Sequence, residues 1–254
     1  MRAFLAFTKK EWVELIRTGR LAILLVLFSL FGIMNPAIAK LTPWMMETMA
    51  DSLKKTGLTV AAVKVDAMTS WMQFYKNIPI AMVIFLLMFG GILTAEYQKG
   101  TLINMLTKGL ARWKVILAKC FIMTATWTVC YWLCYGITYG YNWYFWENGI
   151  ASHLGFAAAC VWMLGIWLIA VILLMSTVFQ TSSAVLAATG GIVAVSYAIG
   201  LIPKARKFLP THLLEASGML SGAGSIEEYW CTVWITIGLG VVGVLAAVLA
   251  YSKK

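Results

Sequence analysis

Charged residues are scarce in this sequence of 254 residues. Asp, Glu, Lys and Arg together make up 12% of it, whereas hydrophobic residues make up 61%. A water-soluble domain of ordinary composition carries about 25% charged residues. The shortage of charge therefore argues against a water-soluble protein and predicts a chain that lies within a membrane.

Residues that perform catalysis or bind metals are also few. The two histidines, His153 and His212, lie in different segments, and the five cysteines lie in or beside apolar runs without the paired spacing of a metal site. No Gly-x-x-x-x-Gly-Lys-Ser/Thr phosphate loop occurs, so the chain is not expected to bind ATP by that route. We therefore predict no catalytic residue, metal site or cofactor in this chain.

The charged residues avoid the middle of the apolar runs. Ionisable side chains inside a membrane usually mark proton or ion coupling, so their absence argues against a proton-driven transporter. The net charge of +10 comes from Lys and Arg in short loops beside apolar runs, where such residues set the membrane topology. This distribution predicts no surface that binds nucleic acid.

Six apolar segments are long enough for a helix to cross a bilayer, which takes about 20 residues. Between Asn148 and Pro203 the sequence contains no charged residue, and a run of that length requires two spans joined by a polar hinge at Gln180–Ser183. The predicted fold class is an all-α integral membrane protein with a single transmembrane domain. Its spans are expected at about residues 21–39, 78–95, 115–141, 153–179, 183–202 and 230–251.

The distribution of Lys and Arg predicts the orientation of these spans. With the N-terminus in the cytoplasm, the cytoplasmic segments hold 12 of these residues, and the longer outer segments hold 8. Positive residues favour the cytoplasmic side of a membrane. Both termini are therefore expected in the cytoplasm, with outer loops at residues 40–77 and 203–229.

The tripeptide Asn35-Pro36-Ala37 also occurs in aquaporins, which need two copies of it on facing half-helices. This sequence has one copy, at the end of the first apolar segment, so it does not support a water channel. Because the residue before a proline disfavours helical geometry, Pro36 is expected to end the first helix.

Residues 3–17 have the spacing of an amphipathic helix. Phe4, Trp12 and Ile16 fall on an apolar face, and charged residues fall opposite, with Lys10 and Glu14 spaced as an i,i+4 ion pair. Such a helix is expected to lie in the inner membrane interface, within residues 1–20. It would serve either as a passive anchor or as a lever that rests on a cytoplasmic subunit.

A charged segment at residues 96–114 separates the second and third spans. Glu96 offers a carboxylate for a salt bridge or a helix cap, and Gly100 permits a tight backbone turn. Three basic residues are possible partners of the carboxylate: Lys99, Arg112 and Lys119. We expect a cytoplasmic elbow at which a soluble partner docks, and the alternative for Glu96 is a solvated charge at the membrane boundary.

The last outer loop contains an apolar tract, Phe208–Leu214, that is too short to cross a bilayer. Pro203 and Pro210 interrupt helical structure around it. The tract, which includes Phe208, Pro210 and His212, is expected to form a re-entrant or interfacial helical segment near the outer surface.

The charged segment closely resembles the hallmark of the permease subunits of type-two ABC exporters. In that family the second span runs into Glu-x-x-x-Gly-Thr, followed by an apolar stretch, an Arg and a Lys that enters the third span. The matching residues here are Glu96, Gly100, Thr101, Arg112 and Lys119. The resemblance covers nearly the whole chain, including the N-terminal helix and the outer segment, and is to small stand-alone permeases of Gram-positive bacteria.

The resemblance implies that those five residues couple the chain to a separate ABC ATPase subunit, which would bind ATP and magnesium. The chain has about half the spans of a full transporter core, so a second permease copy or a similar permease is also implied. Its surroundings would be the lipid of a bacterial plasma membrane.

The function expected on this basis is ATP-driven export, with a homodimer of this chain or a pair with a similar permease as the membrane-spanning core. The apolar and aromatic spans would suit a hydrophobic or amphipathic cargo, such as an antimicrobial peptide in a resistance system or a lipid-like molecule. The alternative is a membrane sensor or immunity protein that binds a peptide at its outer surface without transport.

Overall fold

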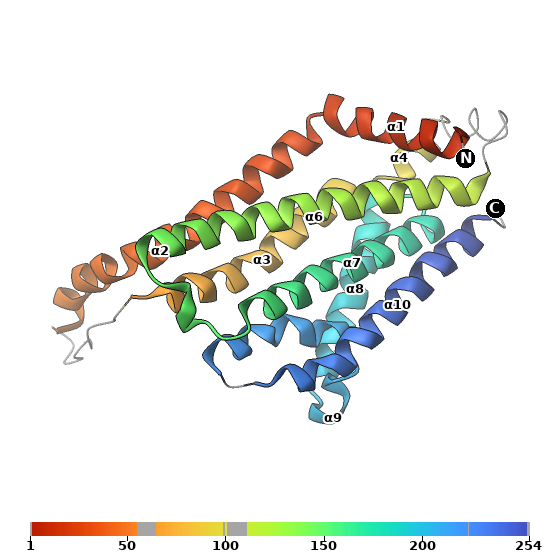
Figure 1. Ribbon diagram of the computed structural model, residues 1–254. Helices are drawn as coiled ribbons and strands as arrows, with labels where there is room; N and C mark the ends of the chain where they lie inside the picture. The colour runs from red at the N-terminus through yellow and green to blue at the C-terminus, as the bar shows by residue number, and fades with distance from the viewer. Residues whose placement is uncertain (1, 55–64, 99, 101–110, 223, 253–254) are drawn as a thin grey trace.

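The computed structural model describes residues 2–54, 65–98, 100, 111–222 and 224–252 (Figure 1). Every regular element within these ranges is a helix, which confirms the predicted all-α fold. The elements in chain order are α1 (Arg2–Arg17), α2 (Arg20–Lys54), α3 (Ala67–Phe89), α4 (Thr94–Gln98), α6 (Arg112–Phe145), η1 (Asn148–Ile150), α7 (Leu154–Val178), α8 (Ser182–Gly200), α9 (Pro203–Arg206), η2 (Pro210–Ser221) and α10 (Ile226–Ser252).

Six stretches of helix in the described ranges are long and apolar enough to cross a membrane, which confirms the predicted number of spans. They are Arg20–Met45, Ala67–Gln98, Arg112–Phe145, Leu154–Val178, Ser182–Gly200 and Ile226–Ser252. The two ends of the chain lie at the same end of the helix bundle, as an even number of crossings requires (Figure 1).

The first long helix does not end at Pro36, so that prediction was wrong. Helix α2 continues through Pro36 and Pro43 to Lys54. A proline at position 36 cannot donate to the carbonyl of Gly32, four residues earlier. The hydroxyl of Thr138 on α6 donates to that carbonyl instead, at 3.1 Å. A neighbouring helix thus supplies the missing hydrogen bond, which is how prolines are tolerated in membrane helices.

Helical structure also extends into the predicted outer loop at residues 40–77. Helix α2 occupies this loop up to Lys54, and α3 begins at Ala67. The Asp66 side chain caps α3 by accepting a hydrogen bond from the backbone N–H of Thr69 at 3.0 Å. The ends of the helices differ from the ends of the apolar segments because hydropathy shows only where the sequence becomes apolar. A helix continues until its backbone geometry is interrupted.

The centre of the bundle is a tight contact between α6 and α7. The Trp127 indole lies against Gly165, where an added Cβ would be 2.2 Å from the ring. The indole N–H donates to the carbonyl of Trp162 at 3.0 Å, and the Tyr131 hydroxyl donates to the carbonyl of Ala158 at 2.7 Å. These bonds satisfy the polar groups of two large buried aromatic side chains.

The segment before the last helix packs against α7, α8 and α10. It forms a 3-10 helix, η2, over Pro210–Ser221, and this helix starts and ends later than the predicted tract at Phe208–Leu214. Pro210 and His212 are buried, whereas Phe208 is 58% exposed. The aromatic residue with which the predicted tract begins therefore lies outside the packed segment.

Candidate functional site

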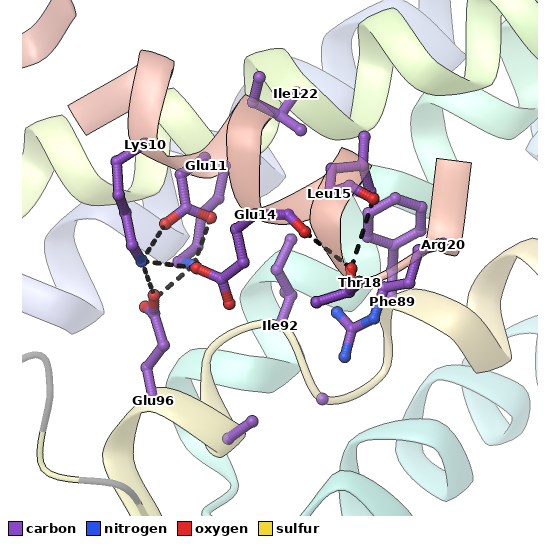
Figure 2. Close-up of a pocket in the computed structure, with 13 residues that line it drawn as sticks. Lys10, Glu11, Glu14, Leu15, Thr18, Arg20, Phe89, Ile92, Glu96 and Ile122 are labelled. Carbon is purple, nitrogen blue, oxygen red and sulfur yellow. Dashed lines mark hydrogen bonds and ion pairs between the residues drawn. The ribbon is translucent and has the colours of Figure 1, made fainter. Parts of the chain in front are cut away.

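Charged side chains from three helices meet at the end of the bundle that carries the termini (Figure 2). Lys10, Glu11 and Glu14 come from α1, Glu96 from α4 and Lys119 from α6. We call these five residues the ion cluster. The segments that hold them are far apart in the sequence, so the fold is needed to assemble the cluster.

Four of the five side chains form a closed ring of ion pairs. The Lys10 ammonium lies 2.9 Å from Glu11 Oε1 and 2.7 Å from Glu96 Oε1. The Lys119 ammonium lies 2.9 Å from the other oxygen of each carboxylate. Each glutamate thus bridges both lysines, and the ring joins α1, α4 and α6. Glu14 lies outside the ring and pairs with Lys10 at 2.8 Å.

Burial differs sharply within the cluster. The Lys119 side chain is 1% exposed, and Glu11 and Glu96 are also buried, whereas Lys10 is 34% exposed and Glu14 is 47% exposed. Removing one member of a buried ion pair leaves a charge that water cannot solvate, which costs about 3–5 kcal/mol. The buried side of the ring therefore resists separation of the three helices that carry it.

The electrostatic environment keeps Lys10 charged. Partial burial alone would lower its pKa, but hydrogen bonds to Glu14, Glu96 and Glu11 outweigh burial and raise the pKa above the ordinary lysine value. Carboxylate oxygens of the three glutamates lie within 4.8 Å of one another, a spacing that could hold a metal ion. The Lys10 ammonium already bonds to all three carboxylates and supplies the positive charge there.

Local packing explains how Glu11 and Glu96 reach the ring. Phe7, Glu11 and Leu15 share the buried face of α1, which packs on α6. Glu96 lies on the short helix α4, which follows the turn after α3. The Thr94 hydroxyl at the start of α4 is hydrogen-bonded to the Ser182 hydroxyl at 2.8 Å, which joins this turn to the first residue of α8.

A cavity of about 280 Å³ lies beside the ion cluster (Figure 2). Arg20 and Thr18 line it at the junction between α1 and α2, and Phe89 and Ile92 line it from α3 and the turn that follows. The charged groups of the ion cluster therefore face a partly open space whose lining also includes apolar side chains.

The structure brings together two of the five residues predicted to couple the chain to an ATPase, Glu96 and Lys119. Arg112 is the first residue of α6, and Gly100 has a left-handed backbone with φ of +65°. Thr101 lies outside the described residues. The predicted contact of Glu96 with a basic residue is therefore found with Lys119.

The apolar face predicted for the N-terminal helix is divided in the structure. Phe4 packs against the core, whereas Trp12 is 38% exposed and Ile16 is 51% exposed. Sequence reasoning did not single out Glu11, which lies four residues from both Phe7 and Leu15. The spacing of Phe7, Glu11 and Leu15 was the signal that could have identified it, because it places Glu11 between two apolar residues on one face of the helix. A charged residue on a buried face requires a partner, which here comes from a distant segment.

Comparison with known families identifies the chain. A family model described as ABC-2 family transporter protein matches residues 5–209. The chain belongs to this family. It is therefore a membrane-spanning transport subunit, a permease, that crosses the membrane several times and is not itself catalytic. No curated protein and no solved structure matches it.

The family match confirms the resemblance on which the sequence interpretation was based. The matched range includes the whole ion cluster and the first five spans, and it ends just before η2 and α10. The permeases of this family generally work with an ABC ATPase, so a partner of that class is implied for this chain.

Proposed function

We propose that this permease is the transmembrane subunit of an ATP-driven exporter that works with a separate ATPase subunit. The observation that carries the proposal is the ring of ion pairs, which joins α1 and α4 to α6. It lies where the family motif begins, at the end of the bundle that we expect to face the cytoplasm.

In this proposal the ATPase docks on α1 and on the elbow that follows Glu96, and the ring makes these two elements move as one unit. ATP binding would draw the ATPase subunits together and displace the elbow that follows Glu96. Because Glu96 and Glu11 share both lysines, a displacement of α4 would also displace α1 and the start of α6. Sliding these helices apart would expose unpaired charges to a poorly solvated site, which is costly.

The bond between Thr94 and Ser182 offers a route from the elbow to the fifth span. On α8 only Val185 and Thr189 are buried, so most of this helix faces outward. We propose that α8 borders the transport path and a second permease, which would be another copy of this chain or a similar one.

The side chains of α7 and α8 support a hydrophobic or amphipathic cargo. The large exposed side chains of α8 are apolar or aromatic, namely Val195, Tyr197 and Ile199. No charged residue occurs on α7 or α8. Such surfaces favour an antimicrobial peptide or a lipid-like molecule over a small charged solute. The outward direction and the bacterial plasma membrane follow from the resemblance to exporter permeases.

A pulldown from native membranes tests the partnership. Tagged permease in mild detergent is expected to recover an ABC ATPase in roughly equal amount, and Gly100→Val should remove it by straining the elbow, because Gly100 has φ of +65°. Gly222→Val is the matched control, since Gly222 also has a positive φ, +74°, but lies after η2. Recovery of a histidine kinase without an ATPase would instead support the sensor alternative.

A further inference from the structure

Three neighbouring cavities are lined in part by residues of η2. Helix η2 directly precedes α10, so it lies near the end of α10 that is remote from the C-terminus (Figure 1). The first cavity, about 190 Å³, is lined by residues of α3, α7, α8 and η2. Its lining is apolar except for Tyr197 and Thr211. We call it the tail cavity.

The second cavity, about 210 Å³, shares Tyr197 and Thr211 with the tail cavity. The third, about 320 Å³, shares Arg206, His212 and Glu215 with the second. We call the second and third together the head cavities. The three spaces therefore form a series that changes from apolar to charged.

The charged groups of the head cavities are held in defined positions. Arg206 forms an ion pair with Glu215. His212 and Glu215 are three residues apart on a 3-10 helix, which places them on one face. His212 Nδ1 lies 3.2 Å from the Thr232 hydroxyl, and the His212 ring stacks on Tyr229 with centroids 4.8 Å apart.

Groups of both signs line the third cavity. Arg206 and Lys207 offer positive charge, and Glu215 and Glu228 offer negative charge. Tyr229, which is stacked on His212 at one face, also lines this cavity, and aromatic rings attract ammonium groups. A head group that carries both a phosphate or carboxylate and an ammonium would find partners for both of its charges there.

We propose that the tail and head cavities together form a binding site for a single-chain amphiphile with a zwitterionic head. A cavity of 150 Å³ lined by apolar side chains holds a benzene molecule. The tail cavity therefore has room for one apolar chain end and not for two chains side by side. Val83 and Tyr197 on its border are 54% and 58% exposed, so a chain can enter sideways from the bilayer.

The interpretation of this amphiphile as a transported cargo rests on the proposed exporter function, whereas its binding does not. The site lies within one permease and would bind without a second copy or an ATPase. Binding and transport can therefore be tested separately.

Gly190 and Gly191 provide a matched pair of variants for the binding test. Both lie on α8, and a Cβ added at either position meets nothing within 4 Å. Gly190 lines the tail cavity and Gly191 does not. Gly190→Leu should thus fill the cavity, and Gly191→Leu should add the same side chain to the same helix outside the cavity.

The experiment uses the full chain in lipid nanodiscs with a photoactivatable lysophosphatidylcholine. Cross-links mapped by mass spectrometry are expected on α3 and α8 around the tail cavity. Gly190→Leu should reduce their yield about tenfold, which corresponds to about 1.4 kcal/mol of binding free energy. Gly191→Leu should leave the yield unchanged. Equal yields in both variants, or labelling confined to outward-facing side chains elsewhere, would overturn the site.

A second arm tests the head cavities. An excess of unlabelled lysophosphatidylcholine should compete with the probe better than a non-ionic amphiphile of the same chain length. Arg206→Gln should abolish this preference, and Lys204→Gln should preserve it, because Lys204 lines none of the three cavities. Equal competition by both amphiphiles in the unmodified chain would overturn the zwitterionic assignment.

A third arm separates a cargo from a resident lipid. With the ATPase partner present, ATP should lower the cross-linking yield at the tail cavity if the amphiphile is released outward. A yield that ATP does not change, while the complex hydrolyses ATP, would refute the cargo role and identify a bound membrane lipid. Failure to recover any ATPase would count against the exporter function and leave the binding result intact.

Discussion

Replacing Lys119 by methionine should destabilise this permease strongly. The Lys119 side chain is 1% exposed, and its ammonium lies 2.9 Å from a carboxylate oxygen of both Glu11 and Glu96. In Lys119→Met the three glutamates of the ion cluster would share the single positive charge of Lys10. Methionine is long and unbranched and fills the space, so the loss is mainly electrostatic. We expect the free energy of unfolding to fall by about 3–5 kcal/mol, the cost of breaking a buried pair.

Unfolding in mixed micelles, with the denaturing detergent titrated, measures this change. Lys114→Met is the control, because Lys114 lies on the same helix outside the ion cluster, and it should alter the free energy of unfolding by less than about 0.5 kcal/mol. The double variant Lys119→Met with Glu11→Leu should be more stable than Lys119→Met alone, because it removes one of the three negative charges that would otherwise share the Lys10 ammonium. A single variant as stable as the unmodified chain, or a double variant less stable than the single one, would refute the reasoning.

Three further predictions concern other parts of the fold. Gly165→Ala should lower the free energy of unfolding by about 1–3 kcal/mol by forcing α6 and α7 apart. Gly155→Ala on the same helix is the control, because its added Cβ meets nothing within 4 Å. Equal effects of the two variants in the same titration would contradict the packing. Thr138→Val should cost at least about 1 kcal/mol, because it leaves the Gly32 carbonyl without a donor and the Asn35 amide without this acceptor. Adding Pro36→Ala should recover the part due to the carbonyl by supplying a backbone N–H, and no recovery would contradict this account. Burial and nearby positive charges lower the pKa of His212 below 6.5, so the neutral ring stabilises the fold above pH 6.5, and this contribution is lost as the pH falls further. The rate of hydrogen exchange in η2 should then rise at low pH, and His212→Asn should remove this pH dependence.

The sequence was sufficient to predict the order and number of the spans. Apolar length defines a membrane helix directly, and the hinge before the fifth span appears as predicted, with the Thr181 side chain capping α8. The sequence also offered Lys119 as one of three possible basic partners of Glu96, beside a helix cap and a solvated charge. The choice among them follows from the burial of this carboxylate, which the sequence did not show.

Other features depend on contacts between distant segments. Pro36 remains within a helix because Thr138, about a hundred positions later, replaces its hydrogen bond. Glu11 joins the ring because one face of α1 packs on α6, and periodicity alone does not reveal which face a helix presents to a neighbour. The length of η2 depends in the same way on its packing between other helices. These features could not be predicted without the arrangement of the helices in space.

The measurement that tests the coupling account most directly compares Glu11→Gln with Glu14→Gln in the assembled transporter. Both changes remove one carboxylate from α1, but Glu11 bridges Lys10 and Lys119, whereas Glu14 is 47% exposed and outside the ring. ATP hydrolysis and cargo transport would be measured on the same reconstituted vesicles. The account predicts that Glu11→Gln lowers the amount of cargo moved per ATP hydrolysed, while Glu14→Gln leaves this ratio unchanged. An unchanged ratio in an assembled Glu11→Gln complex would contradict the proposal that the ring transmits the motion of the ATPase to the spans.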